Sequence, residues 1–124
     1  MHFRPRSLLS AQYNQSQRYT NRIDLFIAEH YREKIRLSDL AETLYLCPKQ
    51  VTRIIRKNYG CSFSDLVRDH RLRLARAMLE STEESISSIA RAVGFEYENY
   101  FYTLFRKAYT ITPAEYREKH RPCR

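Results

Sequence analysis

Two polar helix faces in this chain carry side chains of the types that recognise nucleic acids. Each face is what stays exposed when the apolar positions of its helix are buried. Arg, Lys, Asn and Gln match base edges and phosphates, so the chemistry on offer is noncovalent recognition. The first face is formed by Lys49, Gln50, Thr52, Arg53 and Arg56. The second is formed by Glu98, Asn99, Tyr100, Tyr102, Thr103 and Arg106.

The elements that position these faces form a weak internal repeat. Residues 37–44 match residues 86–93 position by position, and residues 51–59 match residues 101–109. The second match is offset by one residue more than the first, so one residue is inserted between the two blocks. An insertion that leaves both flanks in register belongs in a turn. The chain therefore has the pattern of two helix-turn-helix units.

Each unit needs an apolar face on which its two helices pack. The first helix braces the second, so that the N-terminal half of the second can enter the major groove of DNA. In the first unit we expect this face at Leu40, Leu44, Val51, Ile54 and Ile55. In the second unit we expect it at Ile89, Val93, Phe101, Leu104 and Phe105.

Composition favours a helical, basic protein. Two glycines and four prolines leave little room for a turn-rich β fold. The net charge of +8 indicates an anionic partner or a nonspecific affinity for one. Three cysteines without a CxxC pair argue against a disulfide scaffold and against a zinc site, and they fit a reducing cytosol. No apolar run approaches the roughly 18 residues that span a bilayer.

The sequence contains no catalytic constellation. It has no Gly-rich phosphate loop and no nucleophile motif. We therefore expect no enzyme activity, no cofactor, no metal, no membrane partner and no small-molecule site within this chain. The expected localisation is cytoplasmic, at the nucleoid.

We predict an all-α fold of seven helices and no strand, in which two helix-turn-helix lobes, a homeodomain-like pair, are joined by a long linker helix. Pro48 suits a first helical position, Gly60 suits a helix end, and Ser62 opens a capping box. The expected helices cover about 20–31, 37–44, 48–59, 62–80, 86–93, 98–109 and 113–120. The expected domains are a flexible N-terminal tail or linker remnant at 1–19, a first lobe at 20–61, the linker helix at 62–81, and a second lobe with the C-terminal helix at 82–124.

The length of the linker helix supports a paired arrangement. A helix over 62–81 would be roughly 30 Å long, and successive major grooves on one side of B-DNA lie about 34 Å apart. One chain could thus place two recognition helices in successive major grooves. Because the two units differ in sequence, the DNA site would be asymmetric.

From Leu37 to Arg117 the chain resembles the DNA-binding domain of the AraC/XylS family of bacterial transcription regulators. The most specific matches are Gly94–Phe95, Tyr100–Phe101 and the run Thr112-Pro113-x-x-Tyr116-Arg117. Further matches are Leu40–Ala41, Phe63, Arg71–Leu72, Ala75, Ser85–Ala90, Val93, Leu104–Lys107, Ile111 and Ala114–Glu115. The resemblance implies two helix-turn-helix lobes that bind asymmetric DNA sites, most often to activate transcription.

The resemblance also implies roles for individual residues. Base-reading positions fall on Lys49, Thr52 and Arg53, with Gln50 beside them, and on Glu98, Asn99, Tyr102 and Thr103. Apart from the resemblance, we expect phosphate contacts at Arg56, Lys57, Tyr100, Arg106 and Lys107. The family usually has Arg at Thr103, which predicts weaker base reading by the second lobe. It usually has Gly at Thr110, where a positive φ is often needed, which predicts a different end for this helix.

The leading hypothesis is a sequence-specific regulator, an activator, that binds double-stranded DNA and has RNA polymerase as a partner. The alternative is a basic helical module that docks the transcription machinery and binds DNA only nonspecifically. A third hypothesis is single-strand or RNA binding through the tyrosines. For Arg71, two interpretations stay open: a phosphate contact, or a structural bridge between the lobes to an acidic partner such as Asp65 or Asp69.

The start of the chain bears on where a signal would enter. Family members commonly carry a separate sensing domain, and residues 1–19 are too short to hold one. The chain is therefore either a stand-alone regulator or the C-terminal piece of a longer protein. The polar, linker-like start favours the second interpretation.

Overall fold

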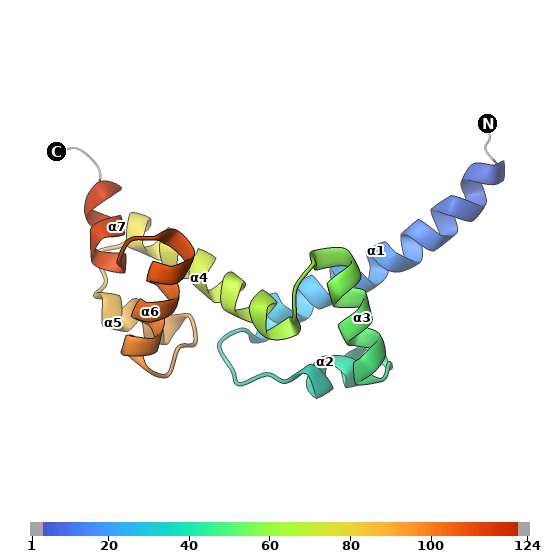
Figure 1. The fold of residues 1–124 in the computed structure, drawn as a ribbon, viewed down its shortest axis with the longest axis horizontal. Coiled ribbons are helices and arrows are strands. Elements are labelled where there is room, and N and C mark those ends of the chain that lie inside the picture. The colour runs from blue at the N-terminus through green and yellow to red at the C-terminus, as the bar shows by residue number, and fades with distance from the viewer. Residues whose placement is uncertain (1–3, 122–124) are drawn as a thin grey trace. The chain divides into compact units, whose positions relative to one another are not determined.

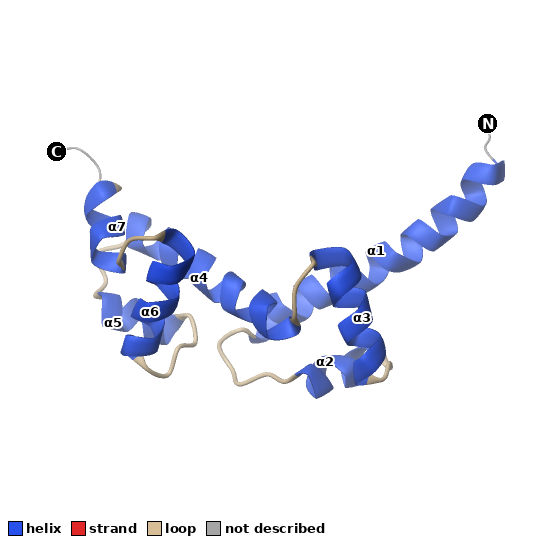
Figure 2. Ribbon diagram, in the orientation of Figure 1, coloured by secondary structure: helices blue, strands red, loops and turns tan. Residues whose placement is uncertain are grey.

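The computed structural model describes residues 4–121, with side chains from residue 17 onwards (Figures 1 and 2). Its helices are α1 Arg4–His30, α2 Leu37–Leu44, α3 Pro48–Tyr59, α4 Phe63–Ser81, α5 Ile86–Ala92, α6 Glu98–Tyr109 and α7 Pro113–Lys119. The described residues contain no strand, so the predicted all-α class of seven helices is confirmed. From α2 onward, every helix begins and ends within one residue of the predicted bounds.

Helix α1 is longer than its apolar pattern predicted. It begins at Arg4, whereas the apolar stripe placed its start at Thr20. Pro5 lies in the first turn, where its missing N–H has no helical partner to lose. No glycine or further proline follows it within α1, so the polar segment can continue the packed part of the helix. Residues 4–19 of the predicted tail are thus helical, and residues 1–3 lie outside the described residues.

The chain divides into two compact units. One comprises Met1–His30 with Ile35–Leu66, and the other comprises Tyr31–Lys34 with Val67–Arg124. The short segment Tyr31–Lys34 therefore belongs with the second unit, although it follows α1 in the sequence. The predicted lobe boundaries, with a separate linker at 62–81, stay a proposal.

The first unit packs α1, α2 and α3 around one apolar core. The buried side chains are Ile23, Phe26 and Ile27 of α1, Leu40, Ala41 and Leu44 of α2, and Val51 and Ile55 of α3. At the far end of α3, the Tyr59 hydroxyl lies 2.6 Å from Asp24 Oδ1 and 3.1 Å from the Thr20 carbonyl oxygen. Burial, together with the Asp24 carboxylate, raises the pKa of Tyr59, so it stays a neutral donor that ties α3 to α1.

The second unit is built around aromatic side chains. Phe101 and Phe105 of α6 are fully buried, with ring centroids 5.7 Å apart. Their core partners are Leu72, Ala75, Leu79, Ile89, Ala90, Val93 and Phe95. The Tyr116 ring of α7 meets Phe105 edge-on at 5.8 Å. Its hydroxyl bonds to Glu80, and burial and this carboxylate raise the pKa of Tyr116 to about 12.

The sequence repeat is also a structural repeat. Val51 and Ile55 of α3 are fully buried, as are their counterparts Phe101 and Phe105 of α6. The predicted bracing residues Ile54 and Leu104 are half-buried at equivalent places. Each recognition helix is followed by a capping box. In the second, the Glu115 amide donates to Thr112 Oγ1 at 3.1 Å and the Thr112 amide donates to Glu115 Oε1 at 2.9 Å.

The equivalence extends to the ends of α3 and α6. Gly60 follows α3 with φ +74°, and Thr110 follows α6 with φ +70°. The Gly60 amide donates to the Arg56 carbonyl at 3.0 Å, and the Thr110 amide donates to the Arg106 carbonyl at 2.7 Å. The prediction that α6 ends differently at Thr110 is therefore wrong. The chain must turn at once into the next capping box, so Thr110 takes the left-handed conformation that a β-branched residue disfavours.

Replacing Thr110 by glycine should stabilise the protein. The substitution removes left-handed strain of about 1 kcal/mol, partly offset by the greater freedom of glycine in the unfolded chain. The matched reverse change, Gly60→Thr, should destabilise by a similar amount, since a Cβ at Gly60 meets nothing within 4 Å and only φ is penalised. Urea unfolding followed by circular dichroism measures both. Unchanged stability of Thr110→Gly would show that the bond from the Thr110 hydroxyl to the Tyr109 carbonyl offsets the strain.

Candidate nucleic-acid interface

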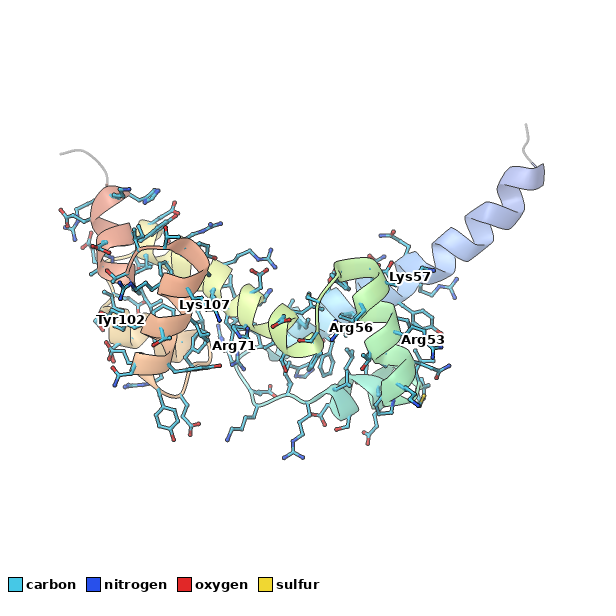
Figure 3. The ribbon with its side chains drawn as sticks, in the orientation of Figure 1. Arg53, Arg56, Lys57, Arg71, Tyr102 and Lys107 are labelled. Atoms are coloured by element: carbon cyan, nitrogen blue, oxygen red, sulfur yellow. The ribbon has the colours of Figure 1, made fainter. Side chains whose placement is uncertain are left out.

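Helix α3 presents the first predicted face to solvent. Lys49, Gln50 and Arg53 are exposed and Thr52 is half-buried, while the opposite side of the helix is buried against α1 and α2. Arg53, Arg56 and Lys57 project from α3 in Figure 3. Pro48 occupies the first helical position, so the helix begins at a defined residue. The face that the sequence predicted is thus held on one rigid element.

Gln50 has a structural task as well as an exposed position. The Cys47 amide donates to Gln50 Oε1 at 3.1 Å, which satisfies an N–H ahead of α3 that has no helical acceptor. The amide oxygen of Gln50 therefore caps the helix, and the side-chain NH₂ group of Gln50 can donate to a base edge. Among the predicted base-reading residues of α3, the long cations Lys49 and Arg53 are exposed.

Helix α6 presents the second predicted face. Glu98, Asn99 and Thr103 are exposed and Tyr102 is half-buried. The Thr103 hydroxyl donates to the Asn99 carbonyl oxygen at 3.1 Å, as is common for threonine inside a helix. With its hydroxyl hydrogen used in this way, Thr103 offers a methyl group and acceptor lone pairs rather than the donor fork of an arginine.

The two faces differ strongly in charge. Helix α3 carries Lys49, Arg53, Arg56 and Lys57 and no acidic residue, a sum of +4. Helix α6 carries Arg106 and Lys107 against Glu98, so 2 − 1 gives +1. Since attraction to phosphates scales with the cations that reach them, α3 has the greater electrostatic pull.

The predicted phosphate contacts lie mostly in the last turns of the two helices. Arg56 and Lys57 occupy the last turn of α3, and Arg106 and Lys107 occupy the last turn of α6. All four are exposed, and cations at these places also stabilise the helix dipole. Tyr100 is 52% exposed near the start of α6, with its ring edge-on to Phe95 at 6.2 Å.

Comparison with known proteins identifies the family of this fold. A helix-turn-helix domain family matches residues 40–119, which is most of the chain. The chain belongs to the AraC/XylS family of DNA-binding transcription regulators. This is a family of regulators and not of enzymes.

Individual relatives agree with this assignment. The chain is 36% identical over 94 residues to the regulatory protein PocR of Salmonella typhimurium, covering 76% of this chain and 31% of PocR. The C-terminal domain of the response regulator yesN from Fusobacterium nucleatum is 40% identical, with a TM-score of 0.71 over 77% of this chain and 93% of that one. An AraC-type regulator from Chromobacterium violaceum is 26% identical, with a TM-score of 0.80 over 86% and 96%. The chain spans less than half the length of the curated relatives it matches first.

Arg71 holds the α5–α6 side of this AraC/XylS domain together. Its Nε donates to the Tyr31 carbonyl at 2.7 Å, and one of its terminal nitrogens donates to the Glu33 carbonyl at 2.9 Å. The guanidinium also lies 5.7 Å from the centre of the Phe95 ring. Burial lowers the pKa of Arg71, but an arginine stays charged. Of the two interpretations of Arg71, the structural one describes these contacts.

The partners of Arg71 are backbone carbonyls rather than the predicted carboxylates. Asp65 accepts from the Ser62 amide at 3.3 Å as part of the cap of α4. Asp69 pairs with Arg73 at 3.0 Å. The sequence suggested acidic partners because opposite charges on one helix are easy to see, whereas bonds to the main chain of a distant segment leave no residue-type signal.

Gly94 is a further residue whose role the sequence pattern only partly revealed. It lies in the turn after α5 with φ +104°, and a Cβ there would lie 2.8 Å from the Tyr31 carbonyl oxygen and 3.0 Å from Arg71 Nε. Glycine thus lets the segment Tyr31–Lys34 approach the turn that leads into α6. The sequence marked Gly94 only as part of the Gly94–Phe95 family match and gave no sign of this close approach.

Two further searches of the described residues were negative. No group of three or more His, Cys, Asp or Glu side chains in this part of the chain could hold a metal ion. None of the described helices has the length and apolar character needed to cross a membrane.

Replacing Arg71 by methionine should destabilise the protein by about 2 kcal/mol, because two charge-assisted hydrogen bonds to the main chain are lost. Arg73→Met is the matched control one half-turn along α4. Its ion pair with Asp69 is more than half exposed on both sides, so its loss should cost under about 0.5 kcal/mol. Urea unfolding of both variants is the measurement. Equal, small effects would contradict a structural role for Arg71.

Proposed function

We propose that this chain is the DNA-binding part of a transcription regulator that recognises a specific duplex sequence through α3 and α6. The observation that carries the proposal is the repeated placement of a polar face on a helix that is anchored on its opposite side by two fully buried side chains. Such a helix has one orientation, so its exposed side chains are pre-positioned for a groove. Membership of a DNA-binding family supports the same conclusion.

In this proposal α3 supplies most of the affinity and much of the specificity. Arg53 and Lys49 are exposed, and no described carboxylate pairs with either. An arginine at this place can donate two parallel hydrogen bonds to guanine O6 and N7. Arg56 and Lys57, further along α3, would contact phosphates and fix the register of the helix on the duplex.

Helix α6 would read a second major groove with different chemistry. Asn99 can pair with adenine and Glu98 can accept from the amino group of cytosine. Tyr102 adds a half-buried aromatic edge. Because these residue types differ from those of α3, the two halves of the site would differ in sequence, and the proposed site is asymmetric.

Activation through RNA polymerase completes the proposal. We also propose that this regulator acts at the chromosome, at the nucleoid. In vitro transcription from a promoter carrying the selected site would test activation, with a rise in transcripts expected and unchanged or reduced output contradicting it.

Selection of duplex DNA from a random pool at near-physiological salt should yield an asymmetric consensus with two conserved blocks about one helical turn apart. A single block would mean that α6 contacts DNA without reading it. No enrichment of any sequence, with equal affinity for all duplexes, would overturn the proposed function in favour of a protein-interaction module with nonspecific DNA affinity.

Arg53→Ala and Lys57→Ala should weaken binding in different ways. Loss of a base contact by Arg53 costs about 1–3 kcal/mol on the selected site and relaxes the preference at one base pair. Loss of a phosphate contact by Lys57 lowers affinity for all duplexes and reduces the salt slope by about 1. Fluorescence anisotropy on the selected duplex and a scrambled duplex separates the two. The same uniform loss in both variants would contradict a base-reading role for Arg53.

A further inference from the structure

A basic groove lies beside the start of α6 and shares only Tyr100 with the second predicted face. Its volume is about 570 Å³. Four cations line it, Arg32, Lys34, Arg71 and Arg91, against the single carboxylate of Glu96. All of its residues belong to the second unit, since Tyr31–Lys34 is part of that unit. The sum of its lining charges is 4 − 1, or +3, which is more than the +1 of α6 itself.

Three of these cations are available to a ligand. Arg32 and Arg91 are exposed, and no carboxylate in the described part of the chain forms an ion pair with Arg91. Lys34 lies 4.0 Å from Glu96, but the Lys34 side chain is 92% exposed. An ion pair this open contributes little, so Lys34 can turn toward an anion.

Arg71 and Gly94 fix the segment that carries two of the cations. The Arg71 guanidinium bonds to the carbonyls of Tyr31 and Glu33, which flank Arg32. Gly94 lets this segment lie against the turn before α6. The Arg32 Nε also donates to the Tyr31 hydroxyl at 3.2 Å. The cations are thus mounted on a braced segment rather than on a free loop.

We propose that this groove binds the phosphate backbone of duplex DNA next to the major groove entered by α6, with Arg32, Lys34 and Arg91 as the contacting side chains. The inference rests on the proposed DNA binding. It follows from the excess of positive charge and from continuity with the recognition helix. Tyr97 and Tyr100 form part of the groove and lie on either side of Glu98 and Asn99.

The side chains that line the groove favour the DNA phosphate backbone over a DNA base as its ligand. The tyrosines on the groove are exposed, 66% for Tyr97 and 52% for Tyr100, and their hydroxyls can donate to phosphate oxygens. Arginine and lysine heads spread along a groove suit a chain of phosphates, because each neutralised phosphate adds affinity independently of sequence. Glu96 is the one lining group that would repel this ligand.

The test measures duplex affinity against salt concentration for the full chain and for variants of the groove. Arg32→Gln and Arg91→Gln should each lower affinity about fivefold at 0.15 M salt and reduce the salt slope by about 0.9. The ratio of selected to scrambled duplex should stay at the wild-type value. Lys119→Gln, which removes an exposed cation of α7 outside the groove, is the matched control and should leave affinity and slope unchanged.

Glu96→Gln provides a gain of function that misfolding cannot mimic. Removing this carboxylate takes away repulsion and frees Lys34, so binding to both duplexes should tighten about two- to fivefold. Melting temperatures close to wild type for the three groove variants would confirm that their folds are intact.

The outcomes separate this inference from the proposed function. Wild-type affinity and slope in the groove variants, with Arg53→Ala still losing the preference for the selected duplex, would overturn the groove and leave the function intact. Poly-glutamate serves as a probe for an acidic protein partner. If the wild-type chain binds poly-glutamate and the groove variants do not, while their DNA binding is unchanged, the groove belongs to an acidic protein partner and the inference is overturned. Absence of duplex binding by the wild-type chain would overturn both.

Discussion

The burial of two side chains one turn apart on each recognition helix is the constraint on which the interface depends. Val51 and Ile55 in α3, and Phe101 and Phe105 in α6, have no exposed surface. Residues four apart lie on the same side of a helix, and full burial of one such side chain is worth about 1.5–3 kcal/mol. Rotating either helix would expose both anchors. Packing of the core therefore sets the orientation of the polar face, and the polar side chains need no contacts with one another to fix that orientation.

Burial fixes the rotation of each helix, and its ends fix its position along the axis. Pro48 begins α3, while residues in the left-handed conformation end α3 and α6. Arginines from later helices then tie in earlier segments. Arg71 bonds to the main chain after α1, and Arg117 bonds to the Leu79 and Thr82 carbonyls around the end of α4. In each case the arginine guanidinium donates to main-chain carbonyls that have no N–H partner within a helix. The same type of contact thus occurs twice in the structure.

Local signals in the sequence were sufficient for the fold, because caps and apolar spacing act within a few residues. Pro48, Gly60 and the Ser62 capping box marked the bounds of α3 and the start of α4, and the internal repeat indicated α2 and α5. The family followed from motifs such as Gly94–Phe95. Helix α1 was underestimated because its first part has no apolar stripe. The end of α6 was predicted wrongly because Thr110 adopts the left-handed backbone conformation that the following turn requires, although threonine disfavours it. The contacts of Arg71 could not be predicted, since main-chain carbonyls carry no residue identity.

The groove beside α6 resolves an imbalance between the two units. Helix α3 carries four cations of its own and can combine base reading with phosphate contacts on one element. Helix α6 carries a carboxylate at its first position and a net +1, so it attracts a polyanion less than α3 does. In our proposal neighbouring segments supply the additional positive charge. Arg32 and Lys34 lie on the segment after α1, and Arg91 lies on α5. With these neighbouring cations supplying the attraction, the start of α6 can keep Glu98 and Asn99, residues that discriminate between bases but add little attraction. In this proposal Arg71 and Gly94 contribute to DNA binding indirectly, because they hold the segment that carries Arg32 and Lys34 beside α6.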